Sequence, residues 1–197
     1  MPGAKLNMEK LISEINQFGK LYISLIKAEN INMIVSKLHS NIQSLNLKNN
    51  DLIYNLPDAK GLYVFFAKFP FRNQNQLLEF GRKWGVLQDK NAPPNCPRFH
   101  KGNSNLHKNK KLLLDNKYIP FYLGKSEKIH GRVLCHLDTT LDKTVYALKL
   151  RARSDMLKNI DFNIASVQFD IPDNSYFCIE LLEKEVRKVL RPIVGKQ

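Results

Sequence analysis

Apolar residues recur every three or four positions over the first fifty residues of the chain. This spacing places them on one face of a helix, so it predicts two helices, the second with Asn30 as a candidate N-cap. Leu56-Pro57-Asp58 interrupts the pattern, and we expect residues 1–55 to form an N-terminal helical extension. The apolar positions are Met8, Leu11, Ile12, Ile15 and Phe18, then Ile31, Ile34, Leu38, Ile42 and Leu45.

Shorter apolar runs further along the chain are typical of β-strands. Residues 61–67 and 118–123 are rich in aromatic and branched side chains, and 163–170 alternates between apolar and polar positions. Helical spacing returns at 127–137 and at 175–190. The predicted order is therefore two helices, two strands, further helices, a third strand and a final helix.

The segment between the first two strands has a different composition. Residues 69–117 combine scattered prolines, glycines and asparagines with many lysines and arginines. A loop of this length in a compact domain is usually functional or disordered, and only Leu77–Trp84 has the spacing of a short helix. We therefore regard 69–117 as a basic insertion in an otherwise regular fold.

Length and composition narrow the class of protein. The chain has 197 residues, of which 43% are hydrophobic and 25% charged, a balance that supports one domain with a packed core. We find no apolar run of the roughly 18 residues that a membrane span needs, and no signal-peptide core at the start. Cys96, Cys135 and Cys178 lack close spacing, which disfavours a disulfide framework or a zinc ribbon. We expect a soluble, cytoplasmic protein.

The charge of the chain indicates a polyanionic partner. There are 31 Lys and Arg against 18 Asp and Glu, a formal net charge of +13. Residues 68–118 hold eleven of the basic side chains and three of the acidic ones, a local excess of +8. Such a field attracts nucleic acid through counterion release, whereas the alternative is a basic protein without such a partner. The concentration in one segment favours a binding surface.

Five residues bring together groups suited to phosphodiester hydrolysis. Tyr63 and Tyr122 lie in the first two predicted strands. Arg132 and His136 share one face of the following helix, and Glu183 borders the apolar stripe of the last helix. Phosphoryl transfer needs an activated oxygen nucleophile, a cation at the equatorial oxygens and stabilisation of the leaving alkoxide. A tyrosine, an arginine and a carboxylate-bound metal would supply these, although each residue alone has an ordinary structural explanation.

Two short motifs frame this set, Gly61-Leu62-Tyr63 and Tyr122-Leu123-Gly124, and Arg132 and His136 follow the second motif. Glu183 lies nine residues before a proline. In this order and spacing the residues resemble the GIY-YIG nuclease superfamily, and most of all a stand-alone restriction-type endonuclease. The register before the proline selects Glu183 over the two other glutamates of its helix.

The resemblance covers residues 56–68 and 119–195 and implies a small fold of the α/β (α+β) class. It implies a three-stranded antiparallel sheet flanked by helices, with the nuclease domain at 56–197 and the basic insertion between its first two strands. Two features depart from the family pattern. The insertion separates the two motif tyrosines by 58 residues, and Gly195 stands where members often have an asparagine.

The resemblance also implies a role for each residue of the set. Tyr63 would position or deprotonate the attacking water, and His136 would accept or relay that proton. Tyr122 would hold the nucleophile or the scissile phosphate, and Arg132 would neutralise the developing charge. Glu183 would bind Mg²⁺ or Mn²⁺, a hard cation that accepts one carboxylate together with waters and phosphate oxygens.

The insertion is the best candidate for reading DNA or for dimerisation. Its basic residues are interleaved with Trp84 and Phe99, which is typical of an arm that contacts DNA, and the alternative is a solvated loop. A zinc site built from Cys96, His100 and His107 lacks an obvious fourth ligand. The candidate DNA-contacting side chains are Lys125, Arg72, Arg82, Lys83, Arg98, Lys101, Lys108, Lys110 and Lys111.

We therefore expect a metal-dependent DNA endonuclease, of the type II restriction class, that cuts double-stranded DNA at a specific site. A freestanding enzyme must pair two copies to cut both strands, so we expect a homodimer on DNA, with the N-terminal helices as a candidate dimer surface. One alternative is a nonspecific or structure-dependent nuclease of the same family in defence, repair or a mobile element. Another is a non-catalytic nucleic-acid-binding protein with a degenerate site.

Overall fold

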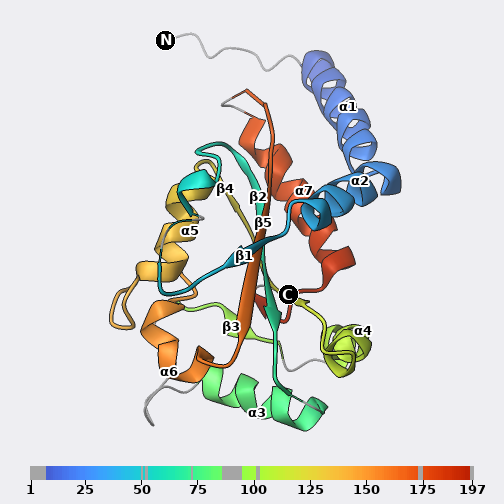
Figure 1. The fold of residues 1–197 in the computed structure, drawn as a ribbon. Coiled ribbons are helices and arrows are strands. Elements are labelled where there is room, and N and C mark those ends of the chain that lie inside the picture. Colours follow the sequence, from blue (N-terminus) through green and yellow to red (C-terminus); the bar gives the residue numbers. More distant parts are fainter. Residues whose placement is uncertain are drawn as a thin grey trace.

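A six-stranded mixed sheet runs through the centre of the computed structural model of this chain (Figure 1). Within the described residues, seven α-helices accompany it. The α/β class predicted from the sequence is therefore confirmed. The structure describes residues 8–49, 51, 53–71, 73–85, 95–100, 103–172 and 175–195, leaving aside the side chains of Leu11 and of 103–108.

Three long antiparallel strands form the middle of the sheet, and they are the three strands that the sequence predicts. They are β2 (Gly61–Lys68), β4 (Ile119–Ser126) and β5 (Asp161–Gln168), with β2 between the other two. The first seven residues of β2 are buried, because both faces of the sheet are covered. A strand in this position reads as one continuous apolar run, which is what the sequence shows.

The prediction of a three-stranded sheet is wrong, because three short strands extend the sheet at both edges. β1 (Gln43–Leu45) pairs with β5 on one side. On the other side, β6 (Val194–Gly195) lies beside β4 and β3 (Arg98–Phe99) beside β6, which gives the order β1-β5-β2-β4-β6-β3. Strands of two or three residues are too short to show an alternating pattern, so the sequence pattern could not reveal them.

Helices cover the two faces of the sheet as separate layers (Figure 1). α2 (Ala28–Ser40) and α7 (Tyr176–Leu190) pack on one face, and α5 (Ile129–Asp138) packs on the other. Successive residues of β2 point to opposite faces, so Leu62 enters the core under α2 and α7, and Tyr63 enters the core under α5. The first motif therefore presents its tyrosine to the α5 side.

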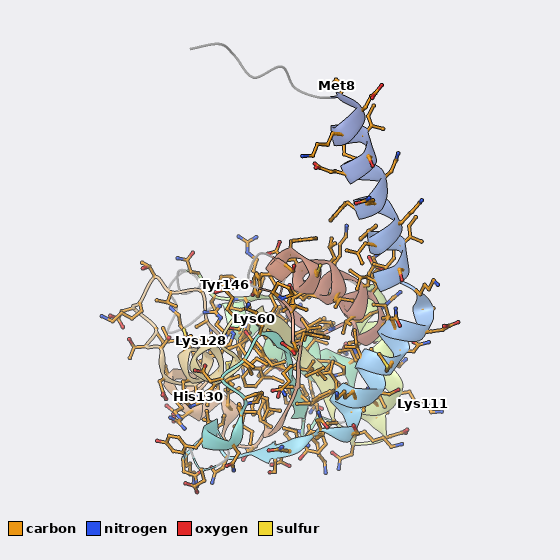
Figure 2. All side chains as sticks on the ribbon, turned by 90° about the horizontal axis from the view of Figure 1, so that it is seen from above. Met8, Lys60, Lys111, Lys128, His130 and Tyr146 are labelled. Atoms are coloured by element: carbon orange, nitrogen blue, oxygen red, sulfur yellow. The ribbon has the colours of Figure 1, made fainter. Side chains whose placement is uncertain are left out.

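The N-terminal region forms the two helices that the sequence predicts, α1 (Met8–Leu25) and α2. The N-cap position of α2 is Lys27 rather than Asn30, whose side-chain Nδ2 instead donates to the Ser24 carbonyl at 2.8 Å. α2 contributes to the core and β1 to the sheet, whereas α1 stands clear of the body (Figures 1 and 2).

The insertion is more regular than the predicted loop. It contains α3 (Gln74–Gly85), which includes the short helix predicted at 77–84, together with β3 and α4 (Asn103–Leu114). The Trp84 indole N–H donates to the Pro97 carbonyl at 2.8 Å and ties α3 to the approach to β3. Ala67 pairs with Ile119, so the insertion leaves and re-enters the sheet at the tip of the β2–β4 hairpin. The insertion therefore lengthens the hairpin without separating its strands.

Shorter elements complete the chain. They are the 3-10 helices η1 (Ile53–Asn55) and η2 (Arg151–Arg153), and α6 (Ser154–Leu157). α5 begins two residues later than the sequence predicts, after a turn in which Ser126 Oγ accepts the Lys128 N–H at 3.0 Å. Among the described residues, no helix has both the length and the apolar character needed to cross a membrane.

Candidate active site

Strand pairing brings the two motif tyrosines together. Phe65 of β2 lies opposite Tyr122 of β4, and Tyr63 lies opposite Gly124, so both tyrosine rings project to the α5 face. Their ring centroids are 6.3 Å apart. The two motifs are therefore neighbours in the sheet despite the insertion between them.

The glycines of the two motifs are explained by close approach. A Cβ on Gly124 would lie 2.4 Å from Tyr63 Oη, so a larger residue at this position would push the tyrosine aside. A Cβ on Gly61 would lie 2.1 Å from the Val167 carbonyl oxygen of the neighbouring strand. Each glycine thus leaves the space that its neighbour across the hairpin or the sheet occupies.

A pocket of about 380 Å³ opens beside the two tyrosines, and we call it the tyrosine pocket. It lies where β4 runs on past the two residues of β6, so the edge of β4 is uncovered there. Four of the five predicted catalytic residues line the pocket, and the fifth, His136, lies behind Tyr63. The lining residues are Tyr63, Tyr122, Gly124, Lys125, Arg132, Tyr146, Glu183 and Arg187.

His136 is held by two hydrogen bonds that fix its tautomer. α5 places the ring in the core, where it is fully buried. The Leu148 backbone N–H donates to Nδ1 at 3.0 Å, so in the neutral ring the hydrogen must reside on Nε2. Nε2 lies 2.8 Å from Tyr63 Oη. His136 therefore donates to the tyrosine oxygen, which differs from the role of proton acceptor expected above.

Burial makes both partners of this pair hard to ionise. Desolvation, with the charge of Arg132, lowers the pKa of His136 well below 6.5, so the ring stays neutral. Desolvation, with nearby Tyr122, raises the pKa of Tyr63 well above 10, against the opposing effect of Arg132. Burial likewise raises the pKa of Tyr122 to about 12. The pocket thus holds two protonated phenols beside a guanidinium.

Arg132 reaches the pocket from the first turn of α5. Its guanidinium Nη2 donates to the Tyr146 carbonyl at 2.6 Å, and its charge acts to lower the pKa of both Tyr63 and Tyr122. The Tyr146 side chain lines the same pocket but had no motif to identify it. Arg132 therefore faces the two phenols while its own position is fixed by the loop after α5.

Glu183 reaches the pocket from α7, and it is paired with an arginine of the same helix. Arg187 lies one turn further on and forms an ion pair with Glu183, while its Nη2 also donates to the Leu123 carbonyl at 2.9 Å. A Cβ on Gly195 would lie 3.0 Å from Arg187 Nη1. Gly195 thus makes room for Arg187, a residue that the sequence analysis missed.

The other two glutamates of α7 point elsewhere. Glu180 pairs with Lys125, and Glu185 pairs with Lys188 at 2.7 Å. Neither glutamate lines the tyrosine pocket. The position of Glu183 in the pocket therefore agrees with the choice made from its register.

A divalent cation would find one protein carboxylate in this pocket. Among the described residues, no group of three or more His, Cys, Asp or Glu side chains is arranged to hold a metal. Glu183 nevertheless fits a hard cation of the Mg²⁺ type, which is commonly held by one or two carboxylates, waters and substrate phosphates. The site thus suits a cation that arrives with a phosphate, and Arg187 competes for the same carboxylate until then.

The candidate DNA-contacting residues are spread over several elements. Lys125 lines the pocket, whereas five others are exposed on α3, β3 and α4 at the insertion. Those five are Arg82, Lys83, Arg98, Lys110 and Lys111. Arg72, Lys101 and the side chain of Lys108 lie outside the described residues.

The cysteine of the alternative zinc site has another partner. Cys96 Sγ accepts a hydrogen bond from Arg153 Nη2 at 3.0 Å. The side chain of His107 lies outside the described residues, so the disfavoured set of Cys96, His100 and His107 is only partly described. The described part offers no zinc cluster.

No protein-family model, no curated protein and no solved structure matches the chain.

Proposed function

We propose that the chain is a metal-dependent endodeoxyribonuclease that hydrolyses a phosphodiester bond in the tyrosine pocket, as the resemblance to GIY-YIG nucleases implies. One observation carries this proposal. Side chains from β2, β4, α5 and α7, which are far apart in the sequence, converge on one pocket of about 380 Å³. Two phenols, a guanidinium and a carboxylate can supply the proton acceptor, the positive charge and the metal ligand that this hydrolysis uses.

Tyr63 is the group best placed to take a proton from the attacking water. As a phenolate its oxygen would accept that proton, while the His136 Nε2–H and the Arg132 charge stabilise the anion before the transfer. His136 stays a hydrogen-bond donor throughout, because Nδ1 is occupied by the Leu148 N–H. The water oxygen then attacks phosphorus, and the bond to the leaving alkoxide breaks.

The other lining residues would hold the phosphate. Tyr122 and Arg132 would donate to its non-bridging oxygens, and Lys125 and Arg187 would add positive charge at the rim. A divalent cation bound at Glu183 would supply charge stabilisation at the scissile phosphate. A compact phosphate site of this kind at the edge of a sheet suits one strand of a nucleic acid, and cleavage of both DNA strands would use two copies.

The decisive experiment is the digestion of a sequenced plasmid by the purified protein with and without Mg²⁺. Discrete fragments are expected for a site-specific restriction-type enzyme, and smears would indicate the nonspecific or structure-dependent alternative. Arg132→Ala and Glu183→Gln should abolish cleavage. Glu185→Gln, on the same helix but paired with Lys188 outside the pocket, should leave it intact and serves as the matched control.

The ion pair between Glu183 and Arg187 favours a second candidate function. If the pair persists in the presence of metal and DNA, the pocket would bind a phosphate without cutting the chain. The protein would then be a nucleic-acid-binding protein. Intact plasmid with every divalent metal, together with salt-sensitive DNA binding, would establish this alternative in place of the nuclease.

A further inference from the structure

Helix α1 extends away from the rest of the molecule. Figure 2 shows it standing clear of the body, with Met8 at its far end. Every described side chain from Met8 to Phe18 is exposed. Near its other end, the Phe18 ring contacts Phe177 of α7 with a centroid distance of 5.4 Å. The first three turns of α1 are therefore held by little of their own chain.

One exposed face of α1 carries apolar side chains from one end of the helix to the other. Met8, Ile12, Ile15 and Ile23 have exposed fractions of 56%, 51%, 58% and 63%. At 100° per residue these four positions fall within about 80° of arc, and Gly19 falls among them. A Cβ on Gly19 would meet no atom within 4 Å. We call these five positions the α1 stripe.

A helix of this kind needs a partner to be stable. Isolated helices of this length are marginal in water, and α1 contains several β-branched residues and a glycine, which lower helix propensity. Burial of the α1 stripe would supply the missing stability. The glycine in the stripe also allows another backbone to approach closely, which favours a second helix as the occupant.

We propose that the α1 stripe binds the α1 stripe of a second copy of this chain, in an antiparallel pair with two-fold symmetry. The positions of the stripe are spaced nearly symmetrically about a midpoint between residues 15 and 16. In the antiparallel pair, Met8 of each copy lies opposite Ile23 of the other, and Ile12 lies opposite Gly19, with the two Ile15 side chains at the centre. The self-complementary order is what an isologous interface requires.

The charges beside the stripe agree with the antiparallel arrangement. Glu9 and Lys20 lie on the same flank of the stripe, at roughly 80° and 100° from its centre. In an antiparallel pair equal flanks face each other, so Glu9 of each copy lies within about one turn of Lys20 of the other. The helix dipoles also oppose each other in this arrangement. A parallel pair would place this flank against the opposite one and lose the contact.

The buried area is of the size that a weak, specific dimer needs. The four apolar side chains of the stripe, each about half exposed, offer on the order of 400 Å² in each copy. With the flanking polar side chains, the pair reaches about 1,000 Å² of buried surface, close to the lower bound of a specific interface. We therefore expect dissociation in the micromolar range.

The first test is the oligomeric state of the full chain by sedimentation velocity, without DNA or metal. The wild type should pass from monomer to dimer as its concentration rises from low to high micromolar, and Ile12→Glu should weaken the dimer at least about tenfold. Met33→Glu is the matched control, because Met33 is 63% exposed on α2, outside the stripe. It should leave the dimer unchanged.

The second test distinguishes the antiparallel pair from other arrangements. Ile15→Cys should cross-link to itself in a mild oxidant, whereas Met8→Cys should not exceed the background of the native cysteines. Glu9→Lys should weaken the dimer, and adding Lys20→Glu should restore it. None of these measurements depends on nuclease activity, so the dimer can be confirmed or refuted independently of the proposed function.

Three results would overturn the proposal. They are a monomer at every concentration, a dimer that Ile12→Glu leaves intact, and self-cross-linking through position 8 in place of position 15. The first would mean that the stripe faces a different protein or another apolar surface, and the last would mean a parallel pair.

Discussion

The pair of Tyr63 and His136 sets the pH dependence expected of the pocket. Burial lowers the pKa of His136 well below 6.5 and raises the pKa of Tyr63 well above 10. If the Tyr63 phenolate accepts the water proton, its population rises about tenfold per pH unit below its pKa. The cleavage rate should therefore climb at this slope between about pH 6 and pH 9, with no inflection from histidine. Initial rates of plasmid nicking across this range measure the slope.

The control for this pH profile is a variant that lacks only the phenolic oxygen of Tyr63. Tyr63→Phe should lower the rate at least about a hundredfold and remove the slope. Tyr54→Phe removes the same atom from a side chain that is 69% exposed and should behave as the wild type. A slope that survives in Tyr63→Phe would assign the titrating proton to another group.

His136 also predicts a loss of stability in acid. Its pKa in the folded state is depressed below the value of 6.5 that an unfolded chain would show. The unfolded state therefore binds a proton that the folded state does not, and stability falls as the pH drops below about 6.5, by up to about 1.4 kcal/mol per pH unit. Urea denaturation at several pH values should show this slope. It should flatten in His136→Asn and persist in His39→Asn, whose side chain is exposed.

Arg187 should weaken the binding of a metal ion and strengthen the binding of DNA. Its ion pair with Glu183 occupies the carboxylate that a cation would use. Arg187→Ala should therefore tighten Mn²⁺ binding about fivefold, because a competing positive charge is removed, and should weaken DNA binding. Calorimetric titration with Mn²⁺ alone measures the first effect. Lys188→Ala, which breaks the pair with Glu185, is the control, and unchanged Mn²⁺ affinity in Arg187→Ala would contradict the competition.

At the scale of the elements, two glycines close in sequence should respond oppositely to alanine. Gly124 on β4 faces Tyr63, and its Cβ would lie 2.4 Å from the tyrosine oxygen. Gly124→Ala should destabilise the fold by about 1–3 kcal/mol and reduce cleavage by displacing Tyr63. Gly131 on α5 meets no atom within 4 Å, so Gly131→Ala should raise stability by about 0.5–1 kcal/mol. Equal effects in urea unfolding would contradict this account of the motif.

The elements also show which secondary structure can be predicted from the pattern of apolar residues in the sequence. β2, β4, β5 and α7 were predicted, because long apolar runs and helical stripes follow from burial of a face. β1 was assigned to a helix, because the three-residue spacing between Ile42 and Leu45 continues the helical pattern of the preceding residues. α4 was missed, since lysine and asparagine make up half of it and three of its four leucines lie together at one end. The pattern therefore recovers elements that bury a full face and loses those that are short or polar.

At the scale of the whole molecule, the site depends on contacts that no local pattern contains. The five motif residues could be chosen by their spacing, but their convergence needs the hairpin to close across the insertion. Arg187 and Tyr146 were missed for the same reason. Arg187 enters the pocket through the space left by Gly195, and Tyr146 comes from a loop without regular structure. Motif spacing therefore selected residues that meet at one pocket, whereas their hydrogen-bond and ion-pair partners could be found only from the fold.

The distribution of charge over the molecule leads to a final prediction. The net charge of +13 and the exposed basic residues of α3 and α4 should make DNA binding strongly salt dependent. Replacing Arg82 and Lys83 together by alanine should reduce the slope of log affinity against log salt by about one to two, since each lost phosphate contact removes about one.

The control for this salt-dependence prediction is a pair of lysines near β1, at the other edge of the sheet. Lys48 and Lys158 are exposed and line one pocket beside β1 and β5, so replacing both by alanine removes the same charge from residues outside the insertion. Filter binding over a range of salt concentrations should show no change in slope for this pair. If both pairs reduce the slope equally, DNA responds to the overall charge of the protein. A reduction confined to Arg82 and Lys83 makes the insertion the surface along which the duplex lies, and the cut strand must then reach the tyrosine pocket along β4.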